Sequence, residues 1–140
     1  MAHWLLKSEP SSWSWDQQVA AGGNGTFWNG VRNHAAKQNL MEMKVGERAF
    51  FYHSGEAKAV VGIVEVMKPY YPDPSDETGT FGMVDVRAVK PLPKAVTLAA
   101  VKAEPRLKEM ALVRFSRLSV QPVTDAEWAL VCQMGGLPGG

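Results

Sequence analysis

Apolar positions along the chain fall into short strand-like runs separated by helix-like segments. Residues 4–6 are an apolar run that stops at a Ser-Glu-Pro sequence, which predicts a first strand. Residues 48–53 are rich in aromatic residues and residues 59–67 in valine, while residues 83–89 alternate apolar and charged positions. Residues 118–123 predict a last short strand. Because residues 48–53 are apolar on both alternating faces, we expect a small α+β fold around a curved sheet or barrel.

Four polar caps predict four helices. For the first and last, a glutamine or glutamate three residues after the cap completes a capping box, in which each side chain accepts from the other residue's backbone amide. A pair of glycines then ends each of these two helices. The predicted helices follow Ser14, Asn33, Thr97 and Thr124 and end near residues 21, 43, 103 and 134, with a further turn after Pro105.

Turn-forming residues mark the loops and the end of the domain. Residues 69–82 carry three prolines and three acidic residues, which predicts a long surface loop that no regular ladder accepts. Residues 22–25 are glycine-rich but lack the spacing and the preceding strand of a dinucleotide-binding loop. The length of 140 residues, with 46% hydrophobic positions, is typical of one globular domain. We expect that domain to span residues 1–136 and residues 137–140 to form a disordered tail.

The formal net charge is only +1, but the charge is unevenly distributed. A chain so close to neutrality does not bind nucleic acid mainly through a positively charged surface, so a pocket would have to contribute to the affinity. Residues 87–117 hold eight basic and two acidic residues, whereas residues 65–85 hold one basic and five acidic residues. One basic side could dock a phosphate backbone; a solvated lysine face on ordinary helices explains the same pattern.

Candidate chemistry is sparse. The single cysteine, Cys132, cannot form an internal disulfide and lies on the core face of a predicted helix, and no signal sequence or membrane-spanning run is visible. We therefore expect a cytoplasmic protein, nucleoid-associated if bacterial, that does not bind membranes. His3, His34 and His53 lack the spacing of metal ligands, and no nucleophile motif is present. We expect no metal, no cofactor and no catalytic residue.

An aromatic ring among amides marks a candidate binding site. The chain has five tryptophans, and Trp28 lies in the sequence Phe-Trp-Asn-Gly-Val-Arg-Asn just before a predicted helix. A ring there can stack on a nucleobase, an interaction worth roughly 1–3 kcal/mol, while amides can read a base edge. The alternative is that Trp28 fills the core beneath a loop.

Five blocks together resemble the EVE domain family, the thymocyte nuclear protein-like group. They are WLLKSEP (4–10), WNGVRN (28–33), FFYHS (50–54), MVDV (83–86) and RLSVQP (117–122). The resemblance implies a PUA-like β-barrel or pseudobarrel with peripheral short helices, related in shape to the YTH readers of methylated adenine. It also implies a non-catalytic reader of a modified base, with 5-methylcytosine or 5-hydroxymethylcytosine in DNA, or modified RNA, as the partner.

Carried over position by position, the resemblance implies a base pocket in which Trp28 stacks and Asn33 and Ser8 hydrogen-bond the base edge. The implied pocket residues are Ser8, Trp28, Val31, Asn33, Tyr52, His53 and Ser54. The residues implied to contact phosphate or brace the pocket are Lys7, Glu9, Arg32, Ser116, Arg117 and Ser119. Arg32 could instead bond backbone carbonyls or Glu9, and His53 could be a satisfied core histidine.

Three functions are consistent with these residues. The first is a monomeric binding module that reads a modified base in DNA or RNA. The second is an enzyme that processes a modified nucleotide or nucleic acid in the same pocket, since base-modifying enzymes also hold an extruded base. The third is a protein-interaction adaptor.

Overall fold

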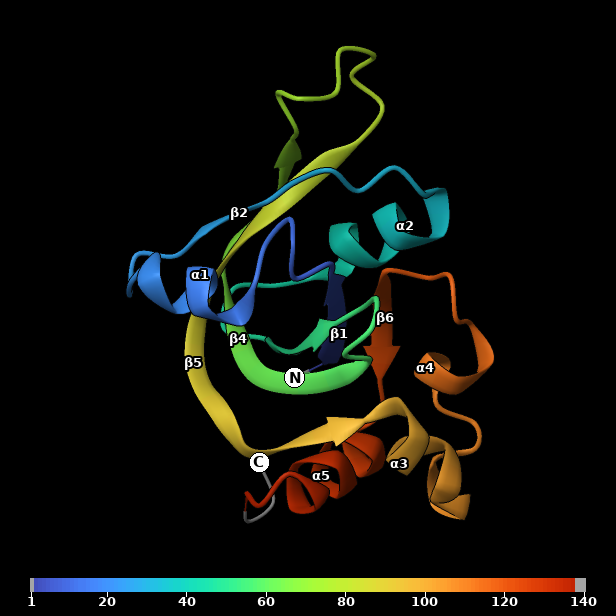
Figure 1. Cartoon of the computed structure of the whole chain (residues 1–140). Coiled ribbons are helices and arrows are strands. Elements are labelled where there is room, and N and C mark those ends of the chain that lie inside the picture. Colours follow the sequence, from blue (N-terminus) through green and yellow to red (C-terminus); the bar gives the residue numbers. More distant parts are fainter. Residues whose placement is uncertain (1, 138–140) are drawn as a thin grey trace.

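Six strands form one sheet that curls into a half-barrel with short helices around it (Figure 1). The computed structural model describes residues 2–137. The strands, in the sheet order β2-β5-β4-β3-β1-β6, are β1 (His3–Ser8), β2 (Thr26–Trp28), β3 (Arg48–His53), β4 (Ala59–Pro72), β5 (Gly82–Thr97) and β6 (Val120–Val123). This architecture confirms the predicted α+β fold around a curved sheet.

One parallel pair lies inside an otherwise antiparallel sheet. β1 pairs in parallel with β3 and antiparallel with β6, while β3, β4 and β5 pair antiparallel in sequence order. β2 pairs antiparallel with β5 at one edge. The segment between β1 and β3 therefore crosses over the sheet, and it carries two helices and β2.

Four of the helices begin at the predicted caps. The helical elements are α1 (Trp15–Ala20), α2 (His34–Glu42), α3 (Leu98–Ala103), the 3-10 helix η1 (Pro105–Leu107), α4 (Ala111–Arg114) and α5 (Asp125–Met134). The side chains of Ser14, Asn33, Thr97 and Thr124 all accept a backbone amide, and both predicted capping boxes are present. α4 was not predicted, because it has four residues and its N-cap forms no side-chain bond. None of these helices, within the described part of the chain, is long and apolar enough to span a membrane.

The predicted long loop is shorter than expected, because strand residues enter it from both ends. β4 continues to Pro72 and pairs with Gly82, so that only residues 73–81 form the loop at the tip of the hairpin. Register shifts on either side of Lys68 allow this extension, because a bulge accommodates the missing proline N–H at position 69. The expectation that no regular ladder would form across residues 69–82 is therefore wrong for residues 69–72 and 82, whereas residues 73–81 form the predicted loop.

The start of the predicted tail is also ordered. The backbone N–H of Leu137 donates to Cys132 O at 2.8 Å, and its side chain packs against the core. Leu137 therefore does not belong to a disordered tail, and residues 138–140 lie outside the described residues.

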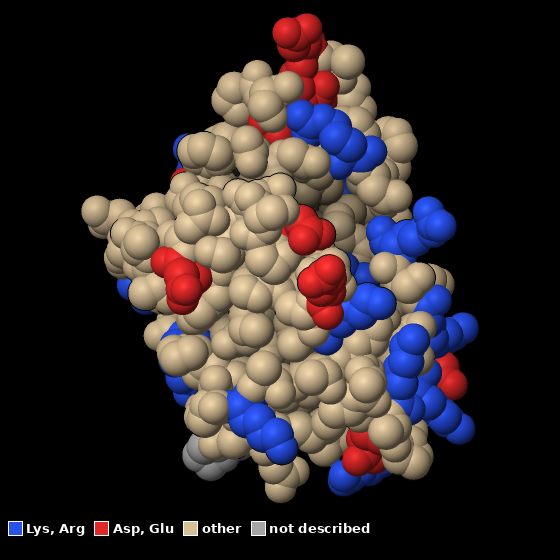
Figure 2. Space-filling model, viewed as in Figure 1, with Lys and Arg blue, Asp and Glu red and all other residues tan. Residues whose placement is uncertain are grey.

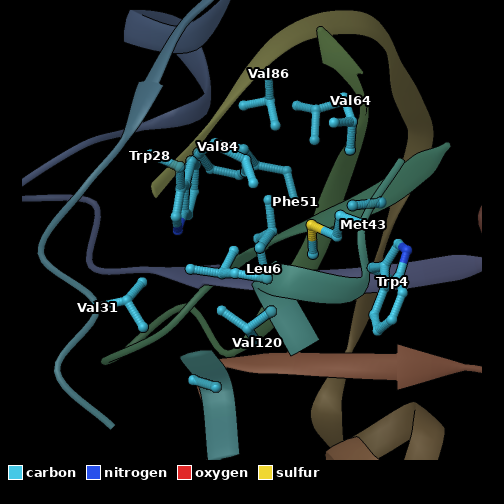
Figure 3. Close-up of a cluster of buried hydrophobic side chains, with 14 of the residues drawn as sticks. Trp4, Leu6, Trp28, Val31, Met43, Phe51, Val64, Val84, Val86 and Val120 are labelled. Carbon is cyan, nitrogen blue, oxygen red and sulfur yellow. The ribbon is translucent and has the colours of Figure 1, made fainter. Parts of the chain in front are cut away.

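The sheet separates two apolar clusters. Trp4, Leu6 and Phe51 belong to the first, in which the side chains of Figure 3 converge. Leu5 and Phe50 belong to the second, where α5 covers the sheet and Trp128 stacks on Phe50 with ring centroids 4.0 Å apart. Because neighbouring strand residues point to opposite faces, both faces of β1 and β3 are buried, and for β3 this was expected from the apolar residues on both faces of residues 48–53.

The free cysteine belongs to this second cluster. Cys132 is fully buried, and its burial raises the pKa of the thiol to about 11. Its role as a packing residue, predicted from helical spacing, is confirmed.

One close approach fixes α1 on the sheet. A Cβ atom added at Gly62 of β4 would overlap the ring of Trp15, the first residue of α1. We expect Gly62→Ala to lower the free energy of unfolding by about 1–3 kcal/mol, since overpacking forces ring and strand apart. Chemical denaturation measures this change. Gly23→Ala, which meets no atom within 4 Å, is the control and should change stability by less than about 0.5 kcal/mol. Equal stability of the two variants would contradict the proposed contact.

Candidate functional site

A hollow of about 250 Å³ lies at the carboxyl end of β1, and we call it the aromatic hollow. Three aromatic residues line it, namely Trp13, Phe27 and Trp28. Ser8, Thr26 and Asn29 add uncharged polar groups, and Lys7 and Ser12 complete the lining. These residues come from the end of β1, the turn before α1, and β2 with the residue after it.

Trp13 is held in place by a buried amide. Its indole Nε1 donates to Gln18 Oε1 at 2.8 Å, and Gln18 Nε2 donates to the carbonyl of Val86 at 3.2 Å. Gln18 is fully buried and lies on α1, whereas Val86 lies on β5. The hydrogen bonds therefore link the Trp13 ring to the sheet through α1.

Trp28 belongs to both the core and the hollow. It is only 7% exposed and meets Phe51 edge to face, with ring centroids 5.4 Å apart and an interplanar angle of 89°. Its neighbour Phe27 is 52% exposed. The alternative that Trp28 fills the core is thus confirmed, and Phe27 is the more accessible aromatic surface.

Ser8 lies in the hollow as predicted, with its hydroxyl already engaged. Ser8 Oγ donates to the carbonyl of Trp13, so the hydroxyl oxygen remains available as an acceptor. Ser8 also links β1 to the end of β3, because its carbonyl accepts from Ser54 N at 2.9 Å. Ser54 therefore supports Ser8 through the backbone and does not line the hollow.

Several predicted pocket residues lie elsewhere. Tyr52 is 3% exposed in the second cluster, because strand alternation points it away from His53 and the first cluster. Val31 is buried in the first cluster. Asn33 caps α2, with Oδ1 accepting from Ala36 N at 2.9 Å, and it lines a different hollow. The structure therefore does not bring these three side chains into the aromatic hollow.

His53 is a second cap for α1. Its Nε2 accepts from the backbone N–H of Trp15 at 3.0 Å. Burial lowers the pKa of His53, and the opposing fields of Asp16 and Glu9 are weaker. The neutral imidazole is the form that accepts this hydrogen bond, so His53 is the satisfied histidine of the alternative interpretation. Glu9 is exposed, and its carboxylate lies against Gly55.

Arg32 braces the segment after Trp28 through a buried aspartate. Its Nη1 contacts Val31 O and Asp73 Oδ2, both at 3.1 Å, which confirms the backbone bracing, but its carboxylate partner is Asp73 and not Glu9. The Asp73 carboxylate also accepts from Gly30 N at 2.9 Å and from Ser75 N at 2.8 Å. Burial by itself raises the pKa of Asp73, but these hydrogen bonds outweigh it and lower the pKa to about 2.

Lys7 joins the aromatic hollow to a second one. Its Nζ donates to Ser116 O at 2.7 Å, and its backbone N–H donates to Ser119 O at 2.9 Å. Burial lowers the pKa of Lys7. Ser116 and Arg117 line the second hollow, of about 360 Å³, together with Asn33. The predicted phosphate or bracing residues thus fall into two groups, one around Lys7 and one around Arg32 and Asp73.

Five residues of the hollow were missed as site residues, namely Ser12, Trp13, Thr26, Phe27 and Asn29. Asn29 lies in the same amide-rich segment as Trp28, so that segment held a usable signal. Trp13 precedes a capping box, and no motif around it indicates a binding role. Thr26 and Phe27 belong to β2, which is a strand only because it pairs with β5. Within residues 2–137 no group of three or more metal-ligating side chains comes together.

The family model that describes the EVE domain matches residues 2–134. Human thymocyte nuclear protein 1 is 33% identical over 95% of this chain and 73% of its own length, and the chicken protein is 35% identical over 94% of this chain and 68% of its own length. These matches, with the sheet described above, confirm the EVE, PUA-like fold expected from the five blocks.

Solved structures agree with this match. Protein Atu2648 from Agrobacterium tumefaciens superimposes with a TM-score of 0.96 at 49% identity and covers 100% of this chain and 97% of its own. A crystal structure of human THYN1 protein in complex with 5-methylcytosine-containing DNA has a TM-score of 0.88 at 32% identity. The match covers 96% of this chain and 98% of the THYN1 chain. The YTH domain of Zygosaccharomyces rouxii MRB1, in complex with N6-methyladenosine RNA, is 16% identical with a TM-score of 0.58. The match covers 96% of this chain and 86% of the YTH chain, and it shows a likeness of fold alone.

Removing the Gln18 amide tests how Trp13 is held. Gln18→Met keeps the volume but leaves Trp13 Nε1 and Val86 O without their partner, so we expect the free energy of unfolding to fall by about 1–3 kcal/mol. Denaturant titration, with near-ultraviolet circular dichroism for the tryptophan environment, measures both effects. Gln38→Met on the exposed face of α2 is the control. Unchanged stability and an unchanged spectrum would mean that these bonds do not hold the ring.

The pKa of Asp73 predicts a pH dependence of stability. The folded value of about 2 lies below the ordinary 3.8, so the stabilisation is complete above about pH 5 and is lost as pH falls through 4 toward 2. Asp73→Asn should remove about 2 kcal/mol at pH 7 and progressively less at lower pH. Denaturation between pH 2.5 and 7 checks this, with Glu77→Gln, an exposed neighbour in the same loop, as the control. A difference in the free energy of unfolding between wild type and Asp73→Asn that does not change with pH would refute this prediction.

Proposed function

Because the chain belongs to the EVE domain family, we propose that it is a non-catalytic module that holds one modified nucleobase of a nucleic acid in the aromatic hollow. The observation that carries the proposal is the composition of that hollow, in which three aromatic residues stand beside four uncharged polar residues and one lysine. The human relative crystallised with 5-methylcytosine-containing DNA, similar over 96% of this chain, supports the class of ligand.

The size of the hollow supports a single base as the ligand. Sites for drug-sized molecules range over about 300–1,000 Å³, and a hollow of about 250 Å³ suits something smaller. Aromatic faces can stack on a flat base and contact an added methyl group. Ser8, Thr26 and Asn29 can pair with the base edge without carrying a charge into a confined site.

The ionisable groups next to the hollow are committed to structural bonds. His53 Nε2 accepts from Trp15 N, and Lys7 Nζ donates to Ser116 O. The Nε2 lone pair of His53 is therefore taken up by Trp15 N, and Lys7 Nζ is held at the Ser116 carbonyl through one of its N–H groups. This arrangement supports a binding module over the enzyme hypothesis.

The affinity of short oligonucleotides tests the proposal. Strands with 5-methylcytosine, 5-hydroxymethylcytosine, N6-methyladenine or no modification are titrated against the protein and followed by tryptophan fluorescence. We expect tighter binding of one modified strand, and loss of that preference in Phe27→Ala, since stacking is worth roughly 1–3 kcal/mol. Met41→Ala is the matched control, because Met41 and Phe27 are exposed to 51% and 52%. Trp28→Ala is unsuitable, because truncating a buried tryptophan costs about 3–5 kcal/mol of stability.

Three results would overturn the proposal. The first is equal affinity of the wild type for all strands. The second is a preference for the modified strand that survives in Phe27→Ala. The third is conversion of the modified base, seen by mass spectrometry of the recovered strand, which would favour the enzyme.

A further inference from the structure

An exposed aromatic ring stands outside the aromatic hollow, on the loop after α4. Phe115 is 54% exposed and lines the second hollow with Arg117 and Asn33. Among the described residues, Phe27 and Phe115 are the two aromatic side chains in the group of strongly exposed large apolar residues. Phe27 belongs to the aromatic hollow, which leaves Phe115 without an assigned role.

Hydrogen bonds hold the backbone around Phe115 in place. Gln121 is fully buried, and its Nε2 donates to Phe115 O at 3.1 Å and to Leu118 O at 2.9 Å. Lys7 Nζ holds Ser116 O, and Leu118 N donates to Phe115 O at 3.1 Å. Three carbonyls of this loop therefore accept bonds from the protein, so the loop is preorganised and the phenyl ring stays at the surface.

Positive charge accompanies the ring. The guanidinium of Arg114 lies 5.6 Å from the Phe115 ring centre, and its own charge is paired with Glu109 at 3.1 Å. Arg117 is exposed and forms no ion pair with any residue in the range 2–137. Figure 2 shows Lys and Arg side chains gathered on the side where α3 and α4 lie, away from the acidic tip of the β4–β5 hairpin.

Lys7 connects the second hollow to the aromatic one. Lys7 lines the aromatic hollow, and its ammonium group bonds Ser116, which lines the second. A nucleic-acid strand whose modified base occupies the first hollow would pass Lys7 to reach Phe115 and Arg117. An aromatic face beside an unpaired cation is the combination that binds a base and its phosphate.

We propose that Phe115 and Arg117 form a subsite for the nucleotide next to the modified one, with its base stacked on Phe115 and its phosphate at Arg117. This inference rests on the proposed function. Since a base held in a duplex cannot offer its face to a side chain, the subsite selects a neighbour that is unpaired. The favoured ligand is then a single-stranded segment.

The test compares ligands with and without a neighbour. The probes are 5-methyl-2′-deoxycytidine and a DNA trinucleotide with 5-methylcytosine between two thymidines, titrated against wild type and Phe115→Ala. We expect the variant to bind the trinucleotide about tenfold more weakly and to bind the nucleoside as wild type does. The plain-cytosine trinucleotide should weaken by the same factor, because Phe115 does not contact the modified base.

Further variants separate stacking from other effects. Phe115→Trp should retain wild-type affinity, whereas Val45→Ala, at a site exposed to 55% beyond the far end of α2, should change nothing. Replacing one flanking thymidine by an abasic residue should remove the difference between wild type and Phe115→Ala. Thermal unfolding of each variant, expected to match wild type because the side chain is exposed, shows that the fold is intact.

The outcomes distinguish the two proposals. If wild type prefers the modified trinucleotide and Phe115→Ala binds it equally well, the subsite is refuted while the proposed function stands, and Phe115 belongs to another surface, such as a protein contact. If Phe115→Ala weakens the free nucleoside as well, the ring belongs to the base pocket and the subsite is again refuted. If wild type does not distinguish modified from plain strands, the proposed function fails and the inference falls with it.

Discussion

The parallel pairing of β1 with β3 is the constraint on which the rest of the structure depends. Adjacent parallel strands cannot be joined by a tight turn, so the chain has to cross over the sheet before it returns. The crossover, residues 9–47, contains α1, β2 and α2 and buries Trp15, Trp28, Leu40 and Met43 in the first cluster. It also brings Trp13 and β2 to the carboxyl end of β1, where the aromatic hollow forms. The topology of the sheet thus creates the site.

Burial on both faces of the central strands then decides which side chains reach the site. Phe50 and Phe51 are both fully buried, on opposite faces, so a slip of one residue would exchange the two clusters. The same register directs Ser8 to the aromatic hollow and the ammonium of Lys7 to the carbonyl of Ser116. The hollow therefore has one charged lining residue, Lys7, whose ammonium group is bonded to Ser116.

Buried polar side chains make the surface loops rigid. Gln18 holds the Trp13 ring, Asp73 holds Gly30 and Arg32, and Gln121 holds the loop of Phe115. Each would cost free energy if its partners left, because a polar group without a hydrogen bond is unfavourable in the interior. Loops fixed in this way lose little conformational entropy when they bind, which is the physical advantage of preorganised contacts.

The sequence by itself determined the local elements, and the tertiary structure decided which of them meet. Helix starts at Ser14, Asn33 and Thr124 were predictable because a cap and its amide lie within three residues of each other. The five blocks identified the fold and, through Trp28 and Ser8, part of the hollow. Trp13, Phe27 and the bracing of Arg32 by Asp73 were not predictable. Trp13 is held by Gln18, which bonds Val86 68 residues further along the chain, and Arg32 and Asp73 are 41 residues apart. A local pattern records only bonds that close within a few residues, whereas these bonds exist because the parallel crossover and the curled sheet bring distant segments together.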